Sequence, residues 1–181
     1  MRRHRSVRLA ALPCVAPAAN VVADMTDDTL AHLLSRGAPR APERDALEAW
    51  GRAVGAALPR PAVITLEGDL GAGKTTLARA LCAGLGVDDL GAVTSPTFSL
   101  VQQYAAPAGP VVHVDLYRLR TDAELDALGW DELVATAPVL LVEWPERAAH
   151  TLPVGSIGIT LQHDPGDPER RILRVSSPFQ R

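Results

Sequence analysis

Apolar residues in the first half of the chain recur with helical spacing on both sides of a short strand-like run. Between 43 and 58 they recur every three or four positions, which predicts an amphipathic helix. The run 61–68, PAVITLEG, is rich in β-branched residues and ends in glycine, which predicts a buried strand that opens into a loop. Leucines four residues apart then predict a second helix over 75–85. The expected order is helix, strand, glycine-rich loop and helix.

Strand-like runs dominate the second half of the chain. Three of them are SLVQQY (99–104), VVHVDLYR (111–118) and VLLVEW (139–144). Thr121 and Glu124 have capping-box spacing, which predicts one or two short helices over 121–133. Segments 156–164 and 170–177 alternate around the turn sequence DPGDPE and predict a terminal hairpin. Strands interleaved with helices, followed by strands alone, predict a three-layer α/β domain with a mixed, partly antiparallel central sheet.

Composition indicates one ordinary folded domain. With 181 residues and 47% apolar content the chain can bury a single core, which we place over 43–178. Segment 1–42 is rich in Ala and Pro and poor in aromatic residues, so we expect a disordered N-terminal extension there. Its basic start also suggests a secretory signal, although two prolines interrupt the apolar part. An over-long gene start, with Met25 as the first residue, is the other alternative.

Charge and cysteine content narrow the class of function. A net charge of -3 gives no basic surface field, which argues against tight direct binding of RNA or DNA. Cys14 and Cys82 are the only cysteines and offer neither a disulfide framework nor metal-ligand spacing. No apolar run reaches the roughly 18 residues that a membrane span requires. We therefore expect a cytoplasmic protein without a membrane segment.

The loop after the first strand has the spacing of a phosphate-binding P-loop. Residues 68–75, GDLGAGKT, match G-x-x-x-x-G-K-[ST] at every fixed position and lie between a predicted strand and a predicted helix. The glycines permit left-handed backbone angles that turn successive N–H groups inward. The loop is therefore predicted to form an anion nest at a helix N-terminus, where phosphates bind.

Lys74, in this loop, is the only lysine among 18 basic residues. Its compact ammonium can reach between the β- and γ-phosphates, whereas a planar guanidinium would not fit the same narrow nest. Thr75 then supplies a hydroxyl for Mg²⁺, and Thr76 is placed to reach the α-phosphate. Neither the Asn-Lys-x-Asp motif of guanine-specific GTPases nor the Leu-Ser-Gly-Gly-Gln signature of transporter ATPases follows. ATP is therefore the expected nucleotide.

Two acids at strand ends are candidate magnesium ligands. Asp115 and Glu143 each follow an apolar run, and a P-loop site needs a carboxylate at the end of a neighbouring strand. A surface acid just beyond a strand end is the alternative interpretation of either residue. His113 lies two residues before Asp115 on the same strand face, and for it a structural hydrogen bond is favoured over catalysis.

Several neighbouring residues have two interpretations. Trp144 can stack on a nucleotide or close the core. The loop TSPTF (94–98) has hydroxyls on both sides of a proline, and it is either a switch that senses the γ-phosphate or a plain turn. Arg118 and Arg120 can meet phosphate or a partner protein.

The ordered set GDLGAGKTT, SPTF, HVDLYRL and LVEWPE within one small domain resembles the TsaE family, the ATPases of bacterial threonylcarbamoyladenosine tRNA modification. The likeness covers roughly 43–177, and the arginine-rich leader departs from the family's compact start. The resemblance implies ATP binding and slow, Mg²⁺-dependent hydrolysis. It also implies a complex with two other proteins, of the TsaB and TsaD type, that transfer threonylcarbamoyl to the adenosine beside the anticodon. Contact with tRNA would then be indirect, through these partners.

The resemblance also implies site residues. The triphosphate would be wrapped by Asp69, Leu70, Gly71, Ala72, Gly73, Lys74, Thr75 and Thr76. Thr75 and Glu143 would hold Mg²⁺ with Asp115 as the second acid, so that Lys74, Asp115 and Glu143 form the catalytic set. Trp144 and Glu146 would lie beside the nucleotide, and Thr94, Ser95 and Thr97 would form a switch loop. Glu43 is a weak match to an N-terminal nucleotide contact.

Three functions use such a site. The leading hypothesis is an ATP-driven accessory subunit of tRNA modification, whose hydrolysis resets the complex and does not itself build the modified base. A small-molecule P-loop kinase would pass phosphate to a hydroxyl, but it usually needs an arginine-bearing lid, for which only the stretch near Arg118 and Arg120 is available. The third is a nucleotide-binding regulatory module without useful turnover.

Overall fold

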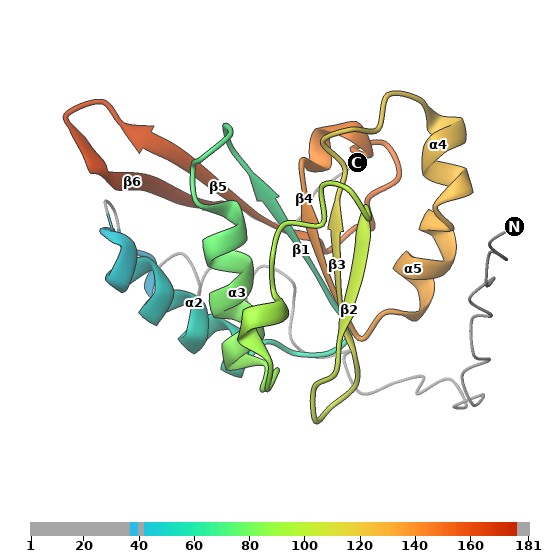
Figure 1. Cartoon of the computed structure of the whole chain (residues 1–181), viewed down its shortest axis with the longest axis horizontal. Helices are drawn as coiled ribbons and strands as arrows, with labels where there is room; N and C mark the ends of the chain where they lie inside the picture. The colour runs from blue at the N-terminus through green and yellow to red at the C-terminus, as the bar shows by residue number, and fades with distance from the viewer. Residues whose placement is uncertain (1–36, 40–41, 177–181) are drawn as a thin grey trace, which may run out of the picture.

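The computed structural model describes residues 37–39 and 42–176, which form a mixed α/β fold (Figure 1). Its helices are α2 (Arg44–Ala57), α3 (Lys74–Gly84), α4 (Asp122–Ala127) and α5 (Trp130–Thr136), with 3-10 turns η1 (Leu90–Ala92) and η2 (Pro145–Arg147). Its strands are β1 (Ala62–Glu67), β2 (Val101–Tyr104), β3 (Val111–Asp115), β4 (Val139–Glu143), β5 (Ile157–Asp164) and β6 (Asp167–Ser176). The predicted order of helices and strands is confirmed.

The strands form one six-stranded sheet in the order β2-β3-β4-β1-β5-β6. The inner strands β3, β4, β1 and β5 are parallel to one another, and the edge strands β2 and β6 are antiparallel to their neighbours. In this register Glu143 lies between Leu66 of β1 and Asp115 of β3. Because parallel strands end at the same edge of a sheet, the loop after β1 and both acids meet there.

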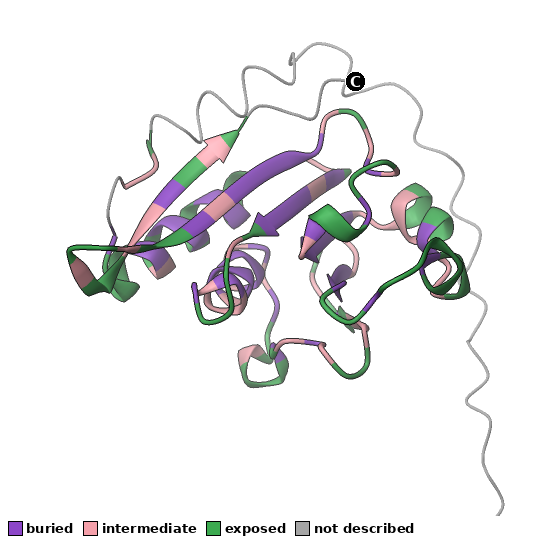
Figure 2. Cartoon of the chain, turned by 90° about the horizontal axis from the view of Figure 1, so that it is seen from above, coloured by how far each residue is buried: buried purple, intermediate pink, exposed green. Residues whose placement is uncertain are grey.

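Helices cover both faces of the sheet, so the predicted three layers are confirmed (Figure 1). One buried cluster joins α2 and α3 to Ile64, Leu66 and Leu141, and the other joins α4 and α5 to Val112 and Val114. Figure 2 shows the buried residues concentrated along the sheet and on the helix faces turned toward it. Since side chains alternate along a strand, the odd-numbered residues of β3 face α3.

The backbones of helices α2 and α3 come into direct contact, because glycines lie where the two helices meet. A Cβ at Gly55 would overlap the carbonyl oxygen of Leu81, and a Cβ at Gly84 would overlap that of Arg52. The apolar positions predicted for α2 are buried, namely Leu47, Trp50, Val54 and Leu58. This contact fixes α3 and therefore the glycine-rich loop at its N-terminus.

Several predicted boundaries differ by a few residues from those of the structure. Strand β3 ends at Asp115 because its side-chain Oδ1 accepts from the backbone N–H of Tyr117 (2.9 Å) and turns the chain. The predicted capping box and short helices are confirmed, with Gly129 (φ 75°) between α4 and α5, but α5 ends at Thr136, three residues beyond the predicted segment 121–133. The terminal turn is shorter than DPGDPE, since β6 already begins at Asp167.

The expectation of disorder over 1–42 falls almost entirely outside the described residues and stays a prediction. Pro42, at its end, is described and buried, and its carbonyl accepts from the backbone N–H of Arg171 (3.1 Å). Ala38, also within this segment, is partly buried and packs against the core. Within residues 37–39 and 42–176, every helix is too short or too polar to cross a bilayer.

Candidate functional site

The 68–73 loop turns sharply between β1 and α3, and its glycines make the turn possible. Gly68, Gly71 and Gly73 have φ of 142°, 78° and 104°, the region that favours glycine. A Cβ at Gly68 would also overlap the carbonyl oxygen of Leu161 on β5. Gly73 is the N-cap of α3, so the free backbone N–H groups of the first helical turn face the loop. This geometry suits the anion nest expected at a helix N-terminus, which stays a prediction.

Lys74 folds back under this loop. Its Nζ donates to the carbonyl oxygens of Gly68 (2.7 Å) and Asp69 (2.8 Å) and lies 4.0 Å from the ring centroid of Trp144. Burial lowers the pKa of Lys74, while the carboxylates of Glu143, Asp115, Glu146 and Asp69 act in the opposite direction. The ammonium therefore lies among four acids, at the point where the loop would receive an anion.

Thr75 and Glu143, the residues predicted to hold Mg²⁺, are in direct contact. The Thr75 hydroxyl donates to Glu143 Oε1 at 2.9 Å, and Glu143 is buried at the end of β4. A hydroxyl beside one carboxylate fits Mg²⁺, which takes few protein ligands and keeps water and phosphate oxygens. The described part of the chain holds no group of three or more His, Cys, Asp and Glu side chains that could bind a metal ion.

Asp115 holds the 94–98 loop. Its Oδ2 accepts from the hydroxyls of Ser95 (2.6 Å) and Thr97 (2.7 Å), and its Oδ1 accepts from the backbone of Tyr117. Both carboxylate oxygens therefore have protein donors. Thr94, by contrast, is exposed and lines neither cavity described below.

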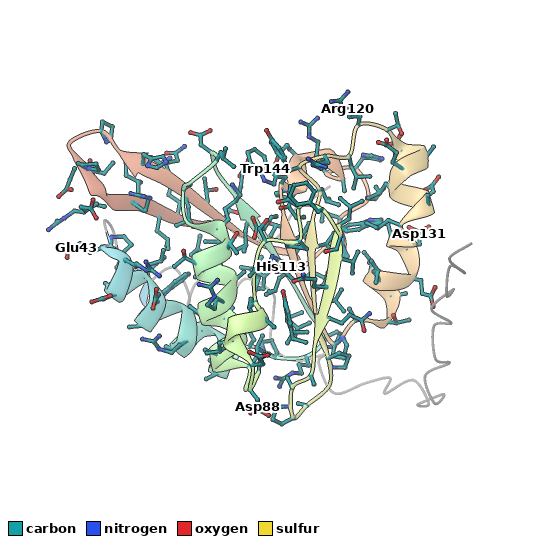
Figure 3. The ribbon with its side chains drawn as sticks, in the orientation of Figure 1. Glu43, Asp88, His113, Arg120, Asp131 and Trp144 are labelled. Atoms are coloured by element: carbon teal, nitrogen blue, oxygen red, sulfur yellow. The ribbon has the colours of Figure 1, made fainter. Side chains whose placement is uncertain are left out.

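Trp144 follows β4 in a left-handed conformation, with φ 60° and ψ 52°. Such a conformation costs a bulky residue roughly 1–3 kcal/mol, so packing must hold it. The half-buried indole lies against Lys74 and 4.9 Å from the Tyr117 ring, centroid to centroid. Figure 3 shows Trp144 near the ends of the central strands, beyond His113. Trp144 thus borders the site and also packs against the α4 and α5 side of the core.

Two cavities meet at Trp144. The first, of about 360 Å³, lies between the loop and Asp115 and is lined by Leu70, Gly71, Gly73, Lys74, Thr75, Thr76, Ser95, Thr97, Asp115, Tyr117, Glu143 and Trp144. The second, of about 450 Å³, is lined by Glu67, Gly68, Asp69, Trp144, Glu146, Thr160 and Gln162. Together they bring all predicted site residues to one place except Ala72, whose side chain is buried in the core, and Thr94.

The weaker candidates lie elsewhere or have other partners. The Arg118 guanidinium lies 4.3 Å from the centroid of the exposed Phe98 ring. Arg120 is exposed beside the start of α4 (Figure 3). Glu43 pairs with Arg170 of β6 (3.2 Å) and lies well to the side of Trp144 in the same view. None of the three, Glu43, Arg118 and Arg120, lines either cavity.

Sequence reasoning missed Arg171, which reaches the loop from β6. Its Nε donates to the Ala72 carbonyl oxygen (3.1 Å), and its Nη1 donates to the carbonyl oxygens of Pro168 (2.7 Å) and Arg170 (2.8 Å). It also missed the lining residues Glu67, Thr160 and Gln162 of the second cavity. No motif marks these positions, because their importance depends on how the C-terminal hairpin packs beside β1.

Arg171→Ala is expected to weaken binding of a nucleotide at this loop about 10-fold, because a bond from a charged donor that orients the Ala72 peptide is lost. The measurement is the dissociation constant of MgATP by calorimetry. Arg170→Ala is the matched control, since Arg170 pairs with Glu43 and Asp167 away from the loop. Equal effects of the two substitutions would show that Arg171 does not support the loop.

Comparisons with known proteins agree with this geometry. A family model described as "Threonylcarbamoyl adenosine biosynthesis protein TsaE" matches residues 41–172. A crystal structure of YdiB from Bacillus subtilis superposes with a TM-score of 0.58 at 30% identity, covering 75% of this chain and 82% of that one. The structural likeness supports the P-loop-like α/β fold.

Relatives in several bacteria carry the name tRNA threonylcarbamoyladenosine biosynthesis protein TsaE. The protein of Synechocystis sp. is 41% identical over 110 residues, covering 59% of this chain and 68% of the relative. The protein of Bacillus subtilis is also 41% identical, covering 61% of this chain and 66% of the relative. For that of Treponema pallidum the identity is 37%, and the alignment covers 62% and 82%. The chain thus spans about two thirds of the length of the first two relatives and more of the third. Because the family model matches residues 41–172, which is most of the chain, this chain belongs to the TsaE family.

Proposed function

We propose that this chain binds ATP and Mg²⁺ at the 68–75 loop and hydrolyses ATP as an accessory subunit in threonylcarbamoyladenosine formation on tRNA. The observation that carries the proposal is the single cavity at the start of α3 that Lys74, Thr75 and Glu143 line together. The names of its relatives support the link to tRNA modification. A reducing cytoplasm suits this role and the sparse cysteine content.

The residues of the cavity have separate tasks on a triphosphate. Backbone N–H groups of the loop and of the first turn of α3 bind phosphate oxygens, and Lys74 exchanges its two carbonyl acceptors for oxygens of the β- and γ-phosphates. Thr75 and Glu143 would hold Mg²⁺, which would supply positive charge beside the phosphates. Asp115 keeps Ser95 and Thr97 beside the site, where a change at the γ-phosphate can release or tighten the 94–98 loop.

Charge balance explains why the metal is required in this proposal. Four carboxylates, those of Glu143, Asp115, Glu146 and Asp69, interact with the ammonium of Lys74. Like charges a few ångströms apart repel one another, so these acids oppose the entry of a free triphosphate. Magnesium compensates this negative charge, and ATP binding should therefore be much weaker in a chelator.

We propose that partner proteins of the TsaB and TsaD type bind the surface around the cavity, because exposed apolar side chains lie there. Of the large exposed apolar side chains in the described residues, Leu70 (77% exposed) and Tyr117 line the cavity, and Phe98 (84% exposed) belongs to the adjoining loop. Exposed apolar side chains gathered at one place mark protein-binding surfaces. The net charge of -3 supports leaving RNA contact to these partners.

A small-molecule kinase is the second candidate, and one observation favours it. The second cavity adjoins the loop at Asp69 and has room for a phosphoryl acceptor beside Trp144. Its acidic lining by Glu67 and Glu146 would suit a cationic or hydroxyl-bearing molecule and not another anion.

A titration of the purified chain with MgATP tests the proposal. We expect saturable binding that a chelator weakens, and slow phosphate release that rises when the two partner proteins are added. Mass spectrometry of a metabolite mixture incubated with MgATP serves as the kinase control. A folded chain that takes up no MgATP would contradict the proposal, and a phosphorylated metabolite would favour the kinase.

A further inference from the structure

A buried row of polar groups lies behind Glu143 and ends on the oxygen that Thr75 contacts. His113 is fully buried, and its Nε2 lies 3.0 Å from Glu143 Oε1. Its other ring nitrogen, Nδ1, lies 3.4 Å from the hydroxyl of Tyr104. That hydroxyl in turn donates to Gln102 Oε1 at 2.6 Å. Figure 3 shows His113 in the middle of the molecule, beneath Trp144.

Strand register brings these groups together. Gln102 on β2 pairs directly with His113 on β3, and Tyr104 pairs with Val111, two residues before His113. On the other side His113 pairs with Leu141, two residues before Glu143 on β4. Residues two apart share a face, so the row crosses three neighbouring strands on the face covered by α3.

Packing of β3 against α3 does not require a polar side chain at position 113. Val111, the neighbour of His113 on the same face of β3, is also fully buried and belongs to the apolar cluster under α3. A buried imidazole without partners would be costly, and here each ring nitrogen faces a polar atom. Because burial raises the pKa of Tyr104 to about 12, its hydroxyl keeps its proton.

The contacts on Glu143 are asymmetric. Both the Thr75 hydroxyl and His113 Nε2 meet Oε1. Within the described residues, Oε2 accepts no hydrogen bond, although the carboxylate lines the cavity. Two donors on one oxygen fix the rotation of the carboxylate and leave the other oxygen for the metal or for a water on it.

We propose that His113 is a positioning residue that orients the Glu143 carboxylate for Mg²⁺, and that Tyr104 orients His113. The inference rests on the proposed function, since it assigns a task within the same magnesium site. Hydrogen-bond partners of metal-binding groups contribute roughly 10–100-fold to metal affinity or activity. His113 never touches the nucleotide in this proposal and acts only through Glu143.

The test compares His113→Leu, which removes the donor, with His113→Gln, whose amide N–H can replace Nε2–H. The first measurement is Mn²⁺ affinity of the ADP-bound chain by electron paramagnetic resonance, and the second is ATP turnover. We expect His113→Leu to weaken Mn²⁺ binding about 10-fold and turnover by a similar factor. His113→Gln should retain most of the wild-type Mn²⁺ affinity and most of the ATP turnover. In both variants the ADP affinity measured in a chelator should stay within about two-fold of wild type.

Tyr104→Phe is the second variant, because a substitution at fully buried position 113 can affect folding. Tyr104→Phe keeps the ring and removes only the hydroxyl that faces His113 Nδ1. We therefore expect a smaller loss of Mn²⁺ affinity than in His113→Leu, and no loss of ADP affinity measured in a chelator. Equal losses in His113→Leu and His113→Gln would overturn the inference, as would unchanged Mn²⁺ affinity in His113→Leu. Failure of the wild-type chain to bind MgATP would instead refute the proposed function and this inference together.

Discussion

Replacing Lys74 with alanine is expected to lower ATP turnover at least about 100-fold, equivalent to roughly 3 kcal/mol of lost transition-state stabilisation. In the described residues it is the only cationic side chain that lines the cavity of the loop, so no neighbour can replace it. The fold should persist, because the ammonium bonds only to backbone carbonyls of Gly68 and Asp69 and its removal takes a charge out of a buried place. Phosphate release and thermal unfolding measure the two effects.

Lys74→Arg is the matched control because it keeps the charge and changes the shape. Nζ lies 2.7 and 2.8 Å from two carbonyl oxygens and 4.0 Å from the Trp144 ring centroid, a space suited to a compact ammonium. We therefore expect the arginine variant to be about as inactive as the alanine variant. An active arginine variant would refute the shape argument, and unchanged turnover in Lys74→Ala would refute the assignment of the loop.

The helices and strands could be predicted because each has a local pattern. The β-branched run before the glycines became β1, and helical spacing of apolar residues became α2 and α3. The glycine loop was predicted from its motif spacing and its place between a strand and a helix, and Gly71 and Gly73 have the positive φ that glycine tolerates. Boundaries were less predictable, because a single Asx turn at Asp115 ended β3 early.

The relation between Asp115 and Glu143 was only partly predictable. Both were expected at strand ends, but their different environments depend on which loop each one meets. Asp115 is used by the hydroxyls of Ser95 and Thr97, whereas Glu143 faces Thr75. Sequence reasoning named both as metal ligands without deciding which one dominates, and that stays a prediction. The structure adds that Asp115 also holds the 94–98 loop.

Long-range contacts explain what sequence reasoning missed. Arg171 reaches Ala72 across 99 positions of sequence, and the link from Tyr104 to His113 depends on the register of β2 against β3. Trp144 is a different case, because a left-handed conformation is typical of glycine and no local pattern predicts it for tryptophan. Packing of distant segments decides all three features.

Glu143→Gln is expected to lower Mg²⁺-dependent turnover at least about 100-fold while leaving nucleotide binding in a chelator unchanged or slightly tighter. Glutamine keeps an oxygen that can accept from Thr75 and His113, so the buried contacts survive and only the charge is lost. Removing one carboxylate from the four around Lys74 also reduces repulsion of a metal-free triphosphate. Turnover is measured across a magnesium titration, and nucleotide binding is measured by calorimetry in a chelator.

Asp115→Asn is the matched control, since the Asp115 carboxylate already has three protein donors. This variant should retain more of the magnesium response than Glu143→Gln. An equal loss of chelator-insensitive binding in Glu143→Gln would indicate a damaged fold and contradict a role through the metal.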